Sequence, residues 1–229
     1  MPQLTLGEID QDGAFLDAFD NMHRSSRADF LRKAAFGGAA LMAVLAAPPP
    51  RAEAKKAATQ ILNFDLTFEY MQAGLYTEAA RLGTVDRMSP EQARWARVFG
   101  AHERAHVRIL EDVLGDAKVR RPFFNFRGVT ENQQEFAKTV VALEDLTTAL
   151  LAGQIPRLTD PGLVSALFSI LSVEARHAAW VRHKRGFLPV AASFDEPKNL
   201  EEVGQIIEAT NFIQPRALMR ATAEPRFTG

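Results

Sequence analysis

Two stretches of this sequence, Glu103-Arg104-Ala105-His106 and Glu174-Ala175-Arg176-His177, repeat one pattern in which a histidine follows a glutamate by three positions. Residues three apart on a helix lie on the same face, so each stretch can direct a carboxylate and an imidazole at one metal ion. Apolar residues flank both motifs at helical spacing: Phe99, Val107 and Leu110 around the first, and Ile170, Leu171, Ala178 and Val181 around the second. Charged side chains on an apolar stripe are costly to bury unless they are paired or bound to metal. The pattern therefore points to metal ligands.

A single glutamate and histidine at this spacing are more often two side chains on the protein surface. A second occurrence in another predicted helix favours a metal site instead. Each motif also follows an isolated acid in an apolar context one predicted helix earlier. Glu69 lies 34 residues before Glu103, and Glu144 lies 30 residues before Glu174. The chain thus contains two similar helical hairpins, and its candidate metal ligands are Glu69, Glu103, His106, Glu144, Glu174 and His177.

Apolar residues at spacings of three and four predict helices throughout the region that carries these acids. The predicted helices span residues 54–82, 89–114, 130–155 and 160–185. Ser89, Thr130 and Asp160 are suitable N-caps, and a proline follows the first and the last of them at the first helical position. The fold class expected is all-α.

The connections between the predicted helices indicate how they are arranged. Short turns join the first helix to the second and the third to the fourth, so each pair forms an antiparallel hairpin. Residues 116–129 are long enough to return along a helix, and we expect a long crossover between helices two and three of a four-helix bundle. The phenylalanines within residues 123–126 are predicted to cover one end of the bundle, with a partner surface as the alternative.

This arrangement resembles the ferritin-like di-iron carboxylate superfamily, whose bundles use a glutamate from each of two helices and a Glu-x-x-His from each of the other two. The likeness covers residues 54–186 and fills all six ligand positions. Residues 63–70, Asn-Phe-Asp-Leu-Thr-Phe-Glu-Tyr, are similar to the ferritin-like family named after desiccation-related plant proteins.

The resemblance implies a role for each ligand and a reaction type. Glu103 and Glu174 would bridge two metal ions, the other two glutamates would be terminal ligands, and each histidine would bind one ion. Four carboxylates balance two divalent ions, whereas without metal they would repel and raise one another's pKa. A metal-free bundle with protonated acids is the alternative. Two further residues are open to either of two interpretations: His102 as a neighbour of the site or an exposed histidine, and Tyr76 as a partner of a ligand or a core residue.

Composition narrows the chemistry of the site. The chain has 229 residues, no cysteine, and a formal net charge of −1. The lack of cysteine excludes disulfides, thiolate sites and a rubrerythrin-type Cys-x-x-Cys centre. Histidine and carboxylate ligands suit iron, manganese or zinc, and the predicted cofactors are two iron ions or two manganese ions. The balanced charge gives no argument for a nucleic-acid partner.

The sequence predicts three segments. Residues 1–53 resemble an export signal, with basic residues, a 14-residue apolar run at 34–47 and a small-x-small site at 52–54. The run is too short for a stable membrane span. Arg27 and its neighbours resemble a twin-arginine signal, but Ala28 stands where the second arginine belongs. We expect the protein to be exported, to the periplasm or another site outside the cytoplasm. The alternative is a cytoplasmic protein in which this segment is a buried amphipathic helix. Residues 54–186 form the bundle, and residues 187–229 a tail with a short helix.

The function expected is that of a dinuclear metal-binding ferritin-like protein with oxidoreductase chemistry on dioxygen, peroxide or Fe(II). The alternative is a non-enzymatic stress or envelope protein whose metal site is structural or sequestering. A homo-oligomer is compatible with both. A catalytic centre has to admit its substrate, whereas a structural site can be closed.

Overall fold

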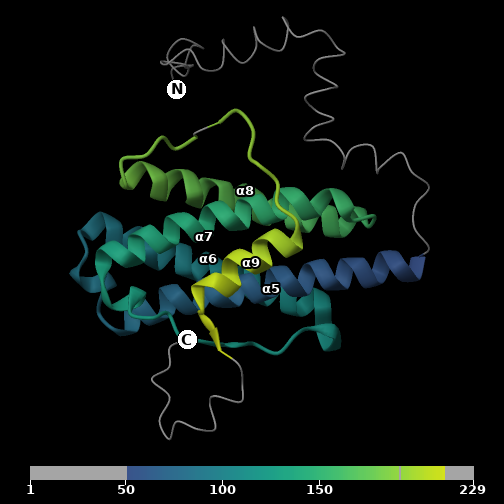
Figure 1. Ribbon diagram of the computed structural model, residues 1–229, viewed down its shortest axis with the longest axis horizontal. Helices are drawn as coiled ribbons and strands as arrows, with labels where there is room; N and C mark the ends of the chain where they lie inside the picture. Colours follow the sequence, from purple (N-terminus) through teal and green to yellow (C-terminus); the bar gives the residue numbers. More distant parts are fainter. Residues whose placement is uncertain (1–50, 191, 215–229) are drawn as a thin grey trace, which may run out of the picture.

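Four long helices pack as a bundle in this computed structural model, which describes residues 51–190 and 192–214 (Figure 1). They are α5 (Arg51–Arg81), α6 (Pro90–Leu114), α7 (Gln133–Gln154) and α8 (Pro161–Lys184). Helix α5 packs mainly on α6, and α7 packs mainly on α8, so the bundle consists of two hairpins. The predicted all-α four-helix bundle with a long crossover is confirmed.

The second and fourth helices start where their capping residues predict. Ser89 and Gln92 form a capping box at the start of α6, and the side chain of Asp160 accepts a hydrogen bond from the backbone of Leu163 at the start of α8. The third helix starts later than predicted. Its cap is Asn132, and Thr130 lies instead in the short 3₁₀ helix η3 (Val129–Glu131).

The crossover packs along the side of α5, so the prediction that its phenylalanines cover one end of the bundle is wrong. A Cβ atom on Gly74 would lie 3.3 Å from the ring of Phe126 and 3.5 Å from that of Phe124. Because the crossover must return along the length of a helix, its apolar residues meet a flank. The crossover begins with the 3₁₀ helix η2 (Gly115–Ala117) and includes strand β1 (Phe123–Phe124).

The segment after α8 returns to the bundle. It contains α9 (Leu200–Thr210), predicted as a short helix, and strand β2 (Ile213–Gln214), which pairs antiparallel with β1. The backbone N–H of Lys198 donates to the carbonyl of Ala149 in α7, which ties the start of α9 to the bundle. The two-residue β2 was not predicted, because so short a strand carries no periodic signal.

The turns between the paired helices are short, as predicted. The 3₁₀ helix η1 (Val85–Arg87) lies between α5 and α6, and η4 (Ile155–Arg157) lies between α7 and α8.

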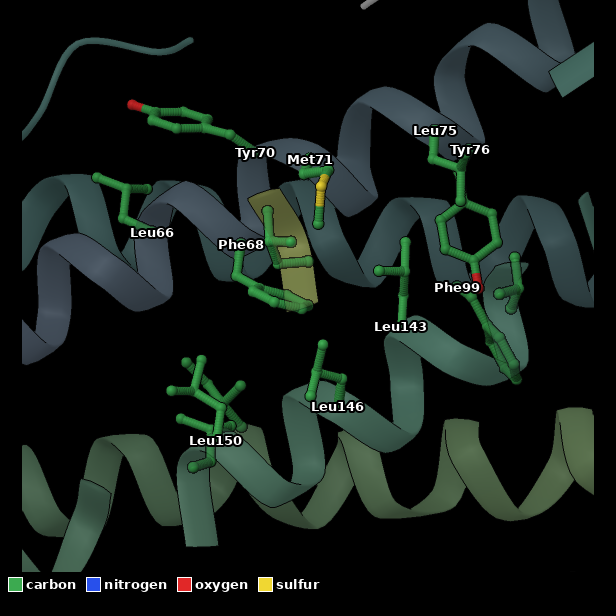
Figure 2. Packing of buried hydrophobic residues seen from close by; sticks show 14 of the residues in the cluster. Leu66, Phe68, Tyr70, Met71, Leu75, Tyr76, Phe99, Leu143, Leu146 and Leu150 are labelled. Atoms are coloured by element: carbon green, nitrogen blue, oxygen red, sulfur yellow. The ribbon is translucent and has the colours of Figure 1, made fainter. Parts of the chain in front are cut away.

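The core lies between the four helices, and α5 is buried on most sides. Figure 2 shows Phe68 and Met71 of α5 facing Leu143, Leu146 and Leu150 of α7. A helix with several packed faces needs neighbours on all of them, and α6, α7 and the crossover supply these contacts to α5.

The predicted export segment lies outside the described residues, except that residues 51–53 form the first turn of α5. Export therefore stays a prediction. Within the described part of the chain, no helix combines the length and apolar character that crossing a membrane requires.

Candidate metal centre

The bundle brings all six candidate ligands into its core. Glu69 comes from α5 and Glu144 from α7, while α6 and α8 each supply one Glu-x-x-His motif. The four glutamates are fully buried, and His177 is almost fully buried. The side chain of His106 is 12% exposed, so the group meets solvent at this residue.

The six residues form two overlapping groups in which the nearest ligand atoms all lie within 4.8 Å of one another. We call them the His106 cluster, consisting of Glu69, Glu103, His106 and Glu174, and the His177 cluster, consisting of Glu103, Glu144, Glu174 and His177. The clusters share Glu103 and Glu174, and this is the arrangement that two adjacent ions bridged by carboxylates require. Exchanging the two hairpins converts one cluster into the other.

Each histidine directs Nδ1 at the carboxylates around it. Nδ1 of His106 lies 2.9 Å from Oε1 of Glu174 and 3.5 Å from Oε2 of Glu69. Nδ1 of His177 lies 3.2 Å from Oε1 of Glu103 and 3.3 Å from Oε2 of Glu144. These short contacts between ligand atoms show that both clusters converge on small volumes.

Most of these converging atoms are buried and have no hydrogen-bond partner among the residues that the structure describes. They are both carboxylate oxygens of Glu69, Glu103 and Glu174, Oε2 of Glu144, and Nδ1 of both histidines. Buried polar atoms are normally satisfied, and a concentration of unsatisfied acceptors calls for an ion or for protons. Four carboxylates and two imidazoles form the donor set that iron, manganese or zinc accepts, so the residues fit such ions.

The pKa shifts in the metal-free chain also reflect the burial of four carboxyl groups close together. Burial raises the pKa of Glu144 to about 7, against the opposing contact with His177. Burial, together with the charge of Glu103, raises the pKa of Glu69 well above its usual value. Burial alone would lower the pKa of His177, but its contacts with Glu103 and Glu144 raise it to about 12. Without metal, the site therefore holds protons that metal ions would displace.

Comparison with known families agrees with this architecture. The model of the ferritin-like domain matches residues 57–186, more than half of the chain. The chain belongs to the ferritin-like domain family. The match spans all six candidate ligands and ends where α8 ends, so the crossover is part of the ferritin-like domain and α9 lies beyond it. No curated protein matches the sequence.

Tyr76 is a partner of a candidate ligand within this ferritin-like domain. Its hydroxyl donates to Oε1 of Glu144 at 2.6 Å and leaves Oε2 free to face the His177 cluster. Figure 2 shows the Tyr76 side chain extending from α5 into the bundle. Gly100 of α6 makes room for it, because a Cβ atom there would lie 2.8 Å from Cβ of Tyr76. Tyr76 is also part of the buried core, so the two interpretations that the sequence left open both describe it.

His102 is the second such partner. Its Nδ1 lies 2.9 Å from Nε2 of His177, and the two rings are nearly parallel, with 9° between their planes. Phe99 stacks on the ring of His177, with its ring centroid 4.0 Å from that of His177. His102 is exposed and still contacts a buried ligand, so the two interpretations offered by the sequence both describe it.

Asp65 belongs near the site, although the sequence analysis did not single it out. It lies one helical turn before Glu69 on α5, it is 1% exposed, and within the described part of the chain neither carboxylate oxygen has a hydrogen-bond partner. Burial raises its pKa to about 7, and the charge of Glu174 adds to the effect. The four-residue spacing from Glu69 is the signal that would have found it.

Proposed function

We propose that this ferritin-like domain holds two redox-active divalent ions, iron or manganese, and carries out oxidation chemistry with dioxygen or peroxide. Fe(II) is itself a candidate substrate. The observation that carries the proposal is the pair of buried clusters that share Glu103 and Glu174 and whose ligand atoms lack hydrogen-bond partners.

The residues divide into bridging and terminal ligands. Glu103 and Glu174, which belong to both clusters, would bridge the ions. Each of the other two glutamates and each histidine belongs to one cluster and would serve one ion. Four carboxylates with a total charge of −4 neutralise two divalent ions, so the filled site needs no further charge compensation in the core.

Two such ions, when bound, supply one electron each to dioxygen or peroxide, and the protein supplies position and shielding. Nδ1 of each histidine faces the carboxylates, and the hydroxyl of Tyr76 donates a hydrogen bond to Oε1 of Glu144. His106 is partly exposed beside candidate ligands that are otherwise buried, and it is here that we expect a small substrate to approach. This access favours a reactive centre over a closed structural one.

Assays with defined metal loading test the proposal. The chain reconstituted with iron or manganese should oxidise Fe(II) in air or consume hydrogen peroxide over repeated turnovers. A Glu103→Ala/His106→Ala variant should do neither. Arg104→Ala, which alters an exposed residue between the two ligands, is the matched control and should retain the activity.

The structural alternative gives a different result in the same preparations. A metal that only stabilises the bundle would raise the unfolding temperature of the wild type without any turnover of Fe(II) or peroxide. That outcome would retain the metal site and reject the oxidation chemistry.

A further inference from the structure

The two clusters have matching ligands but different surroundings. The hairpins align when Glu103 is placed on Glu174 and His106 on His177. In this alignment His102, one residue before the first motif, corresponds to Val173. The hairpin α5–α6 therefore offers the His177 cluster a second imidazole, whereas α7–α8 has an apolar residue at the corresponding place.

The contact between the two histidines joins defined nitrogens. Nδ1 of His177 faces Glu103 and Glu144, which leaves Nε2 as the nitrogen that meets Nδ1 of His102. An imidazole that binds a metal ion through Nδ1 carries its proton on Nε2, so with an ion bound His177 would donate this hydrogen bond and His102 would accept it. Among the described residues, Nε2 of His106 has no hydrogen bond of this kind, and the His106 side chain is 12% exposed, compared with 3% for His177.

We propose that His102 is a positioning residue for His177 and that it makes the two ion positions unequal, the His177 cluster binding its ion more tightly. This inference rests on the proposed dinuclear centre. His102 fixes the ring orientation and the protonated nitrogen of His177, and the stacked Phe99 restricts the ring further. Partners of this kind behind a metal-binding histidine typically change metal affinity by about 10–100-fold.

His102 is well placed for a test because it can be replaced without opening the core. His102 is an exposed residue of α6, and its ring makes a hydrogen bond to His177. His102→Ala removes the acceptor. His102→Asn keeps an acceptor oxygen at about the position of Nδ1. His183→Ala, at an exposed histidine of α8, is the matched control.

The experiment is anaerobic calorimetric titration of the metal-free protein with Mn(II), repeated with Fe(II). The wild type should bind about two ions with unequal affinities. His102→Ala should weaken the tighter step by about 10–100-fold and leave the weaker step unchanged. His102→Asn should recover most of the loss, and His183→Ala should match the wild type. Rescue by asparagine separates a hydrogen bond to His177 from a general effect on folding.

Two ligand backgrounds assign the effect to one position. With His106→Ala, the ion remaining in the His177 cluster should still be weakened by His102→Ala. With His177→Ala, the ion remaining in the His106 cluster should not respond to it. Equal responses in both backgrounds, or no loss in His102→Ala, would overturn the positioning role while leaving the two-ion centre in place. Failure of the wild type to bind either metal would instead reject the proposed function on which the inference rests.

Discussion

The two hairpins of the bundle carry the same ligands and differ in what surrounds them. Both place one glutamate and one Glu-x-x-His motif in the core. In both, the second helix begins with a proline that follows an N-cap residue. The residues around the ligands do not match. When the glutamates are aligned, the differing pairs are Asp65 with Val140, Tyr76 with Leu151, and His102 with Val173.

This difference separates two requirements on the sequence. Two adjacent ions bridged by carboxylates require the same donor set from each hairpin, and the donors agree. The surrounding residues differ between the two positions: Glu144 receives a hydrogen bond from Tyr76, whereas among the described residues no group donates a hydrogen bond to either oxygen of Glu69. In the proposed centre, the candidate ligands would hold the two ions and their neighbours would make the two positions unequal.

The largest expected effect on metal content separates a glutamate that belongs to both clusters from a glutamate that belongs to one. Glu174→Gln alters both clusters, so the variant should retain almost no metal. Glu69→Gln or Glu144→Gln alters one cluster, and each variant should retain about one ion per chain. Elemental analysis of the reconstituted proteins measures the difference. Equal losses in all three variants would contradict the assignment of shared and unshared ligands.

Removing the extra acid of the first hairpin should stabilise the metal-free protein. Asp65→Val makes the position like Val140, and it removes a buried carboxyl whose pKa is raised from 3.8 to about 7 by burial. The folded chain binds this proton more tightly than the unfolded chain. The free energy of unfolding of the wild type therefore falls as the pH rises from about 4 to about 7. At pH 8 the variant should be more stable by about 2–4 kcal/mol.

Urea unfolding of the two metal-free proteins between pH 4 and pH 8 measures this effect. The stability difference should be small at pH 4 and should grow toward pH 8. Asp65→Asn, which removes the charge and keeps a polar group, should show the same loss of pH dependence with less gain in stability. Parallel pH profiles for the wild type and Asp65→Val would show that Asp65 is not the group that titrates.

Tyr76→Phe should affect one cluster more than the other. It removes the hydrogen bond to Glu144 and leaves Oε1 of that buried carboxylate without a partner. We expect a loss of about 1.5–3 kcal/mol in the metal-free protein and an ion in the His177 cluster that binds about tenfold more weakly. Denaturation and metal titration measure the two effects. Leu151→Ala is a packing control that should lower stability and leave the relative affinities of the two ions unchanged.

The smallest expected effects are at the matched helix starts. Ser89→Ala and Asp160→Ala each remove an N-cap from the second helix of a hairpin, and each should cost about 1 kcal/mol in stability. Neither change lies near the ligands, so metal content should not change. Thermal unfolding measures both, and a loss of metal in one variant alone would show that the hairpins are not equivalent even at their turns.

Local signals in the sequence were sufficient for most of the fold. Ser89 and Asp160 were correctly predicted as caps because their hydrogen bonds are made within one turn. The third helix was misplaced because Thr130 also looks like a cap. In the structure the hydroxyl of Thr130 donates to the buried carboxylate of Glu78, which joins η3 to α5, and Asn132 caps α7 instead. Sequence spacing carries no information about that contact.

The candidate site divides in the same way. The six candidate ligands could be predicted to lie together because each Glu-x-x-His lies within one helical turn and because the hairpin repeats. The contact between His102 and His177 joins α6 to α8, and it depends on how the two hairpins pack. Asp65 could be predicted only in part. Its four-residue spacing from Glu69 is visible in the sequence, but its lack of a hydrogen-bond partner among the described residues is not.

The most direct test of the account is the metal content of the chain after anaerobic reconstitution with Fe(II) or Mn(II). The wild type should contain about two ions per chain, and Glu103→Ala/His106→Ala should contain almost none. Absence of bound metal in the wild type, or an equal content in the variant, would contradict the dinuclear centre on which the comparison of the two hairpins depends.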